Sequence, residues 1–411
     1  MKILKLAPYY APERVSSSHL TEDLERAYAA AGMETEIYCP TPTRGISDEE
    51  FEQYKSIKYE ETHGGAVKIH RFSMFREGRN PILRAVRYVL VHLVQYWKGV
   101  HAKDVDLIMA GSTPPTQGIL CGLVKNRLSK KYGRGVPFIY NLQDVFPDSL
   151  ITAGLAKKGG LLWKIGRKIE DRTYRYADKI IVISDDIKQN IMEKGVPEEK
   201  IRVISNWINT EKVQPVNRYD NPLGRELGID PERFTVVYAG NLGLLQGVDT
   251  LIRAAERLQD EPIDFLIFGR GAAEEQLKAQ AADLQNVTFY PLQPAERVAE
   301  VYSLGDVCTV LCNKGAGGSA VPSKTWTIMA CSTPIVASFD TDSELARMLE
   351  ETGAGLCVEP ENDEALADAL RMCCAKMNQL DRLGANGRAY VEQNLSAEIC
   401  TAKYIEVIKE G

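Results

Sequence analysis

The segment at residues 320–330, with the sequence AVPSKTWTIMA, places a lysine where an anion could bind. Pro322 ends any preceding strand, and Ser323 is a favourable N-cap for a short helix of the residues that follow. Lys324 would then lie in the first helical turn, where the helix dipole disfavours a cation. A phosphate group would remove this conflict, because free backbone N–H groups and a lysine bind phosphate together. A capped helix with a solvated lysine fits the segment alone equally well.

Glycine-rich segments follow two predicted strands in the second half of the chain. Residues 238–247 (YAGNLGLLQG) would let a ligand approach the backbone and would direct the next helix N-terminus toward it. Residues 268–271 (FGRG) place Arg270 at the end of the following strand, either against a nucleotide or as a solvated turn residue. The first segment is not GxGxxG, and no acidic residue follows the second strand, so a dinucleotide-dependent oxidoreductase is disfavoured. A tight turn without a ligand also explains the first segment.

Two loops add further polar candidates. Residues 313–319 (NKGAGGS) form a donor-rich loop, and its Lys314 would join Lys324 in a cluster suited to anions. In the first half, residues 141–149 (NLQDVFPDS) follow an apolar strand and carry Asp144. A carboxylate there could bind a hydroxyl group or act in proton transfer, although capping of a turn by an aspartate is a common alternative.

Short strands alternate with helical patterns along the whole chain, which predicts an α/β fold with parallel sheets. A polar stretch divides the pattern into two arrays, so we expect two doubly wound, Rossmann-like domains facing across a cleft, with ligands at the carboxyl ends of the strands. The predicted domains are residues 1–208 and 223–394, with a linker at 209–222 and a final helical segment at 395–411. The predicted strands span residues 3–7, 36–39, 67–72, 105–110, 136–142, 179–183 and 201–204, then 234–239, 263–268, 287–290, 306–311, 334–338 and 355–359.

The composition is that of an ordinary globular protein of 411 residues, with 44% hydrophobic and 26% charged residues. A net charge of −6 argues against a protein that coats nucleic acid. The nine cysteines contain no CxxC pair, which disfavours a zinc site or a disulfide framework and suits a reducing cytoplasm. A strand pattern begins directly after Met1 and Lys2, so we expect no signal peptide.

Residues 80–103 combine aliphatic residues at helical spacing with arginine, lysine and histidine. Such a basic amphipathic helix could rest on the inner face of a cell membrane or bind a lipid-linked phosphate. A surface helix packed on its own domain is the common alternative. The apolar run at residues 86–97 is interrupted by Arg87, His92 and Gln95 and is too short to span a bilayer.

Five motifs in the same order resemble the family 4 retaining glycosyltransferases of the GT-B fold. Within that family they resemble the fucosamine-transferase (WbuB-like) branch of bacterial surface-polysaccharide enzymes, and the resemblance covers almost the whole chain. The motifs are YYAPE at residues 9–13, GSTPP at 111–115, QDVFPDS at 143–149, GNLG with QG at 240–247, and VPSK at 321–324.

The resemblance implies that a nucleotide-sugar donor, most simply a UDP-sugar, binds the second domain and that a glycan or polyprenyl-linked acceptor binds the first. The transferred sugar would be an N-acetylated 6-deoxyhexosamine or another hexose, transferred with retention of configuration and without a metal or other cofactor. Asp144 and Lys324 would be catalytic. The donor-binding residues would be Gly240, Asn241, Gly243, Gln246, Gly269, Arg270, Gly271, Lys314, Ser319, Pro322, Ser323 and Thr327. The acceptor-binding residues would be Tyr9, Tyr10, Glu13, Arg14, Ser16 and Gln143.

The sequence departs from the family at the positions that usually clamp the diphosphate. Many members carry an arginine and a lysine where Asn241 and Gln246 stand, so the positive charge must come from Lys324, Lys314 or Arg270. The paired glutamates of the family would fall near Ser319 and Thr327. Lys324 and helix N-termini would then neutralise the departing diphosphate, while Asp144 positions the acceptor hydroxyl, which loses its proton to that phosphate.

Two other classes of protein remain open. A nucleotide-sugar epimerase of the same architecture needs carboxylate and histidine pairs, but none of the five histidines falls in a loop of the second half. A nucleotide-sugar-binding protein without activity would explain the missing arginine, lysine and glutamates. We expect no nucleic acid partner.

Overall fold

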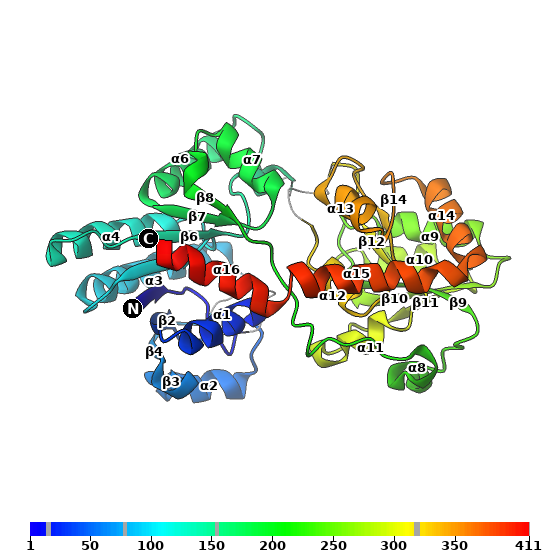
Figure 1. The fold of residues 1–411 in the computed structure, drawn as a ribbon, viewed down its shortest axis with the longest axis horizontal. Coiled ribbons are helices and arrows are strands. Elements are labelled where there is room, and N and C mark those ends of the chain that lie inside the picture. The colour runs from blue at the N-terminus through cyan, green and yellow to red at the C-terminus, as the bar shows by residue number, and fades with distance from the viewer. Residues whose placement is uncertain (14–17, 77–79, 153–155, 316–320, 411) are drawn as a thin grey trace. The chain divides into compact units, whose positions relative to one another are not determined.

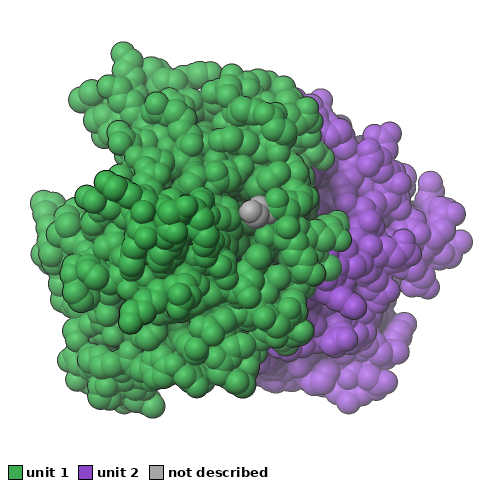
Figure 2. Space-filling view, turned by 60° about the vertical axis from the view of Figure 1, so that its left-hand side comes forward, with its two compact units in different colours: residues 1–205, 400–411 green, residues 206–399 purple. Residues whose placement is uncertain are grey.

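The computed structural model describes residues 1–411 except 14–17, 77–79, 153–155, 316–320 and 411. The chain divides into two compact units, drawn in different colours in Figure 2. Unit 1 contains residues 1–205 and 400–411, and unit 2 contains residues 206–399. Each unit is an α/β domain built on its own sheet (Figure 1).

Unit 1 is built on an eight-stranded sheet with the strand order β3-β4-β2-β1-β5-β6-β7-β8. All neighbouring strands are parallel except β3, which pairs antiparallel with β4. The central strands are fully buried, as Ile3, Ile108 and Ile139 illustrate, because helices cover both faces. The strands are β1 (Lys2–Leu6), β2 (Glu34–Pro40), β3 (Tyr59–Thr62), β4 (Val67–Phe72), β5 (Leu107–Gly111), β6 (Phe138–Leu142), β7 (Lys179–Val182) and β8 (Ile201–Val203).

The predicted strands of this half are confirmed, but β3 was missed. Its sequence, Tyr-Glu-Glu-Thr, is mostly exposed at the sheet edge. A strand of this kind buries no apolar face, so it carries none of the periodic signal that reveals the interior strands.

The helices of unit 1 form layers on the sheet, and α4 packs between α3 and α6. The close approach of α4 and α6 depends on Gly118 and Gly122. A Cβ atom there would lie 2.1 Å from Thr173 and 2.2 Å from Tyr176. The α-helices are α1 (Ser18–Ala30), α2 (Asp48–Ser56), α3 (Pro81–His101), α4 (Gln117–Tyr132), α5 (Asp148–Thr152), α6 (Leu161–Tyr176), α7 (Asp185–Glu193) and α16 (Ala397–Glu410).

Unit 2 is built on a six-stranded parallel sheet with the order β11-β10-β9-β12-β13-β14. The predicted strands are confirmed, although β9 and β10 extend to Asn241 and Arg270, two residues beyond the predicted ends at 239 and 268. The strands are β9 (Phe234–Asn241), β10 (Ile263–Arg270), β11 (Val287–Tyr290), β12 (Val307–Leu311), β13 (Ile335–Ser338) and β14 (Gly355–Val358). The helices are α8 (Pro222–Leu227), α9 (Val248–Arg257), α10 (Glu274–Gln280), α11 (Val298–Tyr302), α12 (Lys324–Ala330), α13 (Glu344–Thr352), α14 (Asp363–Ala375) and α15 (Leu380–Asn394).

Each sheet has one topological switch point, where the chain stops adding strands on one side of the first strand and continues on its other side. In unit 2 the chain moves outward from β9 to β11 and then returns to β12 on the other side of β9. In unit 1 the same reversal separates β1 from β5. Loops diverge at such switch points and leave a crevice outside the carboxyl ends of the strands, where ligands of doubly wound folds bind.

Candidate functional site

Lys324 is the first residue of α12 and lies near the switch point of unit 2. Although the residue as a whole is partly exposed, its Nζ atom is buried, and no described residue accepts a hydrogen bond from it. The Nζ atom lies over the ring of Tyr238, 4.2 Å from the centroid. Burial lowers the pKa of Lys324 to about 8. A buried ammonium group without an acceptor is unfavourable, so the site favours an anion as its missing partner.

Because Gly240 has no side chain, the end of the Lys324 side chain can pack directly against the backbone there. A Cβ atom at this position would lie 2.8 Å from the Nζ atom of Lys324, and the backbone φ angle is 151°. The hydroxyl group of Tyr238 donates to the carbonyl oxygen of Asn241 at 2.8 Å, which holds the ring under the lysine. The structure therefore brings together Gly240 and Lys324, two of the predicted site residues, by direct packing.

The prediction that Ser323 caps α12 is wrong. Its backbone is already helical, and its side chain makes no capping hydrogen bond. The first turn is closed instead by the Thr325 amide, which donates to the carbonyl oxygen of Pro322 at 2.9 Å. The Ser323 side chain is exposed, and Thr327 is half-buried one turn after Lys324.

The other glycines of unit 2 serve close packing between neighbouring segments. A Cβ atom on Gly269 would lie 2.3 Å from the carbonyl oxygen of Gly240, and one on Gly271 would lie 2.3 Å from that of Leu242. Asn241 and Arg270 are paired in register at the ends of β9 and β10, and both are exposed. These two side chains therefore stand at the carboxyl edge of the sheet, where the prediction requires them.

The loops after β9 and β12 are tied to each other. The Asn313 amide donates to the carbonyl oxygen of Leu245 at 3.2 Å, and its side chain donates to that of Leu244 at 3.0 Å. Gly243 and Gln246 close the first of these loops through a backbone hydrogen bond of 3.2 Å. The Lys314 side chain is exposed, whereas Ser319 lies outside the described residues.

In unit 1, Glu13 and Tyr10 organise the loop after β1. The buried Glu13 carboxylate accepts hydrogen bonds from the backbone amides of Tyr10 at 2.9 Å, Thr43 at 2.7 Å and Arg44 at 3.0 Å. Burial raises the pKa of Glu13, and these amide donors oppose that rise. The Tyr10 hydroxyl is buried and bonds Glu25. Both residues therefore support the loop, and any contribution to acceptor binding would be indirect.

Tyr9 lies on the more open side of the same loop. Its hydroxyl is 2.7 Å from that of Tyr88, and the Arg44 guanidinium lies 4.0 Å from its ring centroid. Arg14 and Ser16, the other predicted acceptor residues of this region, lie outside the described residues.

Asp144 follows β6 and is exposed. It borders a small hollow lined also by Tyr140, Glu170 and Tyr174. No hydrogen bond reaches its carboxylate from the described part of the chain. The neighbouring Gln143 is anchored, because its amide donates to Ser112 Oγ at 3.2 Å. Asp144 is thus presented on a fixed loop with its carboxylate open to a ligand.

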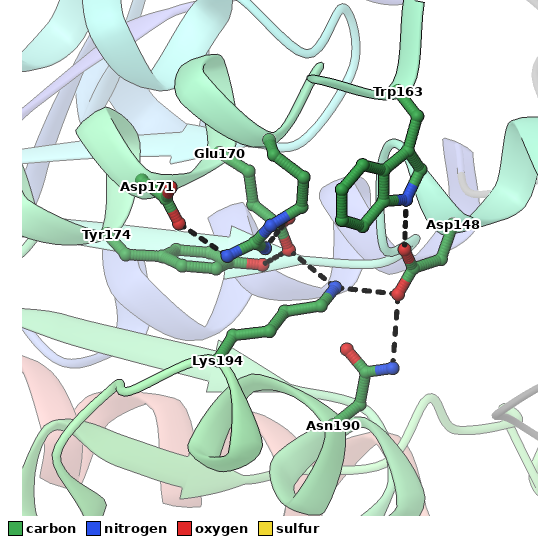
Figure 3. Close-up of polar contacts among 8 residues, drawn as sticks. Asp148, Trp163, Glu170, Asp171, Tyr174, Asn190 and Lys194 are labelled. Carbon is green, nitrogen blue, oxygen red and sulfur yellow. Dashed lines mark hydrogen bonds and ion pairs between the residues drawn. The ribbon is translucent and has the colours of Figure 1, made fainter. Parts of the chain in front are cut away.

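A polar network drawn in Figure 3 holds the far end of the Asp144 loop. Lys194 Nζ lies 2.7 Å from Asp148 Oδ2 and 3.0 Å from Glu170 Oε1, so one lysine joins α7 to α5 and α6. Trp163 Nε1 donates to Asp148 Oδ1 at 3.4 Å, and Asn190 Nδ2 donates to Asp148 Oδ2 at 3.2 Å. Burial alone would raise the pKa of Asp148, but the hydrogen bonds and charge of Lys194 hold it below its usual value.

This network settles which aspartate of the 141–149 segment has the structural role: it is Asp148. Lys194 and Glu170 were not predicted, because neither stands in a motif and the contact joins three separate helices. The burial of Glu170 could have been inferred from its position on the inner face of a helical pattern, but its partners could not.

No group of three or more histidine, cysteine, aspartate or glutamate side chains that could hold a metal ion occurs among the described residues. Within the same residues, no helix is both long and apolar enough to cross a membrane.

Comparison with known proteins agrees with this fold. Residues 222–390 match the family model "Glycosyl transferases group 1", and residues 18–212 match "Glycosyltransferase Family 4". WcaI of Escherichia coli (strain K12), a glycosyl transferase named for colanic acid biosynthesis, is 27% identical over 423 residues and covers 100% of both chains. The glycosyltransferase WbjE of Pseudomonas aeruginosa is 28% identical over 312 residues, which are 75% of each chain. The structure of Anabaena HepE in complex with UDP aligns over 100% of both chains with a TM-score of 0.72 and 16% identity.

The chain is a glycosyltransferase with the GT-B fold, built from two Rossmann-like α/β domains. The two family models divide the chain much as the two sheets do: one matches most of unit 1 and the other most of unit 2.

Proposed function

We propose that the protein transfers a sugar from a UDP-linked donor to a hydroxyl group of a glycan or lipid-linked acceptor, with retention of configuration, in the synthesis of a bacterial surface polysaccharide or glycoconjugate. The observation that carries this proposal is the buried Nζ atom of Lys324, which has no hydrogen-bond acceptor among the described residues. The colanic acid role in the name of WcaI and the UDP bound to HepE support the product class and the nucleotide.

The donor diphosphate would bind beside Lys324 at the switch point of unit 2. The ammonium group would neutralise the negative charge that develops as the sugar–phosphate bond breaks, which is an effective form of transition-state stabilisation in a buried site. Gly240 keeps the space around Nζ open, while Asn241 and Gln246 supply polar but uncharged groups. Arg270 and Lys314 are exposed and could add charge at the rim.

The acceptor would bind unit 1 at the loops after β1 and β6. Asp144 would orient the attacking hydroxyl, whose proton passes to the departing phosphate oxygen. The new glycosidic bond forms as the bond to the diphosphate breaks, so the products are the glycosylated acceptor and UDP. We infer an N-acetylated 6-deoxyhexosamine or another hexose as the sugar, in line with the motifs shared with the fucosamine-transferase branch.

We also propose that α3 rests on the inner face of the cell membrane. Its solvent face is apolar over several turns, with exposed fractions of 60% for Val89 and 62% for both Leu93 and Trp97. Residues 80–103 contain no aspartate or glutamate, so the polar part of this surface is neutral or basic. A helix of this composition lies in the interface of an anionic bilayer.

Incubation with a panel of radiolabelled nucleotide sugars tests the proposed activity. We expect slow hydrolysis of one UDP-sugar, which releases UDP, and a loss of about two orders of magnitude in Lys324→Ala. Asp144→Asn should retain UDP binding and lose transfer. Tight binding without any turnover would favour an inactive binding protein, and interconversion of the sugar would favour an epimerase.

A further inference from the structure

We propose that the start of α6 forms a second membrane contact on unit 1, and that this contact places the Asp144 loop at the lipid surface, where it acts on an acceptor carried by a lipid. This inference rests on the proposed transferase function and names the class of its acceptor. It is carried by a cluster of exposed apolar and basic residues that the glycosyltransferase chemistry does not use.

The apolar part of this cluster is exposed to an unusual degree. Leu161, Leu162 and Ile165 have exposed fractions of 75%, 59% and 49%, and they lie within the first two turns of α6. Side chains three and four residues apart on a helix are neighbours, so Ile165 lies beside both Leu161 and Leu162, and the three side chains form one continuous surface. Large aliphatic side chains grouped in this way mark an interaction site rather than ordinary scattered surface residues.

The same segment is strongly basic. Lys157, Lys158, Lys164 and Lys168 are all exposed, and residues 156–169 contain no aspartate or glutamate. The chain as a whole carries a net charge of −6, so this basic cluster differs in sign from the protein's net charge. An anionic lipid surface complements both parts of the cluster, because its head groups attract the lysines and its acyl boundary accepts the leucines.

A second copy of the chain is a poorer occupant. A two-fold dimer places the same patch on both sides of its interface. The four lysines of one copy would then face the four lysines of the other, with no acidic residue in either segment to balance them. The charge pattern therefore favours a bilayer over self-association.

The cluster is linked directly to the Asp144 loop. Trp163, between the exposed leucines and Ile165, donates to Asp148 at 3.4 Å. One turn further, a Cβ atom on Gly166 would lie 2.5 Å from Pro147, so α6 packs closely on the segment that carries Asp144. A membrane bound by the outer face of this turn would lie beside the loop, and the reacting hydroxyl of the acceptor would be held near the lipid surface.

Flotation with lipid vesicles tests the membrane contact. The probes are vesicles of phosphatidylglycerol mixed with phosphatidylethanolamine, and vesicles of phosphatidylcholine alone. We expect the protein to float with the anionic vesicles only, and the double variant Leu161→Glu/Leu162→Glu to lose at least about tenfold in bound fraction. Leu292→Glu, at a leucine of unit 2 that is 49% exposed, is the matched control and should bind as the unchanged protein does.

Binding of the double variant at the unchanged level would overturn the proposal. So would a loss of self-association in sedimentation velocity without any loss of vesicle binding, because that result would make the patch a contact between copies. Hydrolysis of the donor should be the same in the double variant and the unchanged protein. Donor hydrolysis thus reports on the transferase function independently of the membrane contact.

A separate experiment tests whether the acceptor is linked to a lipid. Bacterial membranes serve as the acceptor source, and the radiolabel is followed from the UDP-sugar into butanol-extractable lipid and into the aqueous phase. We expect the label to enter the lipid fraction and the double variant to lose this incorporation several-fold. Incorporation into water-soluble glycan alone would contradict a lipid-linked acceptor.

Discussion

The Nζ atom of Lys324 lies 4.2 Å from the centroid of the Tyr238 ring, at the carboxyl edge of the unit 2 sheet. The aromatic face offers the ammonium partial compensation, but a cation over a ring keeps its hydrogen-bonding capacity unused. Such a group destabilises the folded protein, and an anion beside it would remove that cost. This relationship supports the proposed placement of the donor diphosphate next to Lys324.

Replacement of this lysine by methionine should stabilise the protein. Methionine keeps the length of the side chain and removes the buried charge, so the free energy of unfolding at pH 7 should rise by about 1–3 kcal/mol. Urea denaturation with a constant m-value measures the change. A fall in stability would mean that Lys324 supports the fold, with partners that differ from those described.

Stability and UDP binding should depend on pH in opposite directions. The pKa of Lys324 in the folded protein, about 8, lies below the ordinary lysine pKa of 10.5. Between these two values the unfolded chain binds the proton and the folded chain does not, so the stability contributed by this group rises with pH across that window. UDP attracts the charged form, so its affinity should fall as the pH rises above 8.

Calorimetry in buffers with different ionisation enthalpies measures the linked proton. We expect net proton uptake when UDP binds near pH 8, and no such uptake in Lys324→Met. If uptake persists in the variant, another group carries the linkage.

Gly240→Ala should impair the site through the same lysine. The new Cβ atom would lie 2.8 Å from Nζ, and the φ angle of 151° is one that alanine rarely adopts. We expect a loss of about 1–3 kcal/mol in stability. In a double-mutant cycle with Lys324→Ala, which removes the clashing atoms, part of this loss should disappear. Strict additivity would show that backbone strain alone explains the effect.

Lys194→Met should destabilise unit 1 and loosen the Asp144 loop. The change leaves the buried Glu170 and the half-buried Asp148 without their shared cation. Removal of one partner from a buried ion pair typically costs about 3–5 kcal/mol, and we expect about 2–3 kcal/mol because Arg167 still contacts Glu170. Lys188→Met, at the exposed pair with Glu198, is the control and should cost less than about 1 kcal/mol.

Lys194→Arg should restore most of the stability if charge is what matters. A Lys194→Met protein as stable as the control would contradict the role of this network.

The fold could be predicted from the sequence because parallel strands that are covered on both faces consist of nearly continuous apolar residues, as in β5 and β6. The exposed edge strand β3 could not, because its residues face solvent. The doubly wound class was also predictable from two successive βα arrays, whereas the strand order of each sheet is known only from the structure. The wrong prediction that Ser323 caps α12 has a different cause. The first turn already begins at Pro322, so Ser323 has helical backbone angles and cannot act as the N-cap.

The contacts that surround the candidate site residues could not be predicted from the sequence. The sequence indicated Lys324 and Gly240 as site residues, yet the Tyr238 ring that buries Nζ belongs to a strand far away in the chain. Lys194 and Glu170 carry no motif, so only the packing of α5, α6 and α7 reveals them (Figure 3). Contacts of this kind depend on tertiary structure and leave no local pattern.

The most direct test of the central claim is the binding of UDP to the unchanged protein and to Lys324→Met, measured by isothermal titration calorimetry at pH 7. The account predicts that the unchanged protein binds UDP and that the more stable, folded variant binds it at least about tenfold more weakly, as expected for the loss of a charged partner of phosphate. Equal affinity of the two proteins would contradict the assignment of Lys324 to the donor diphosphate.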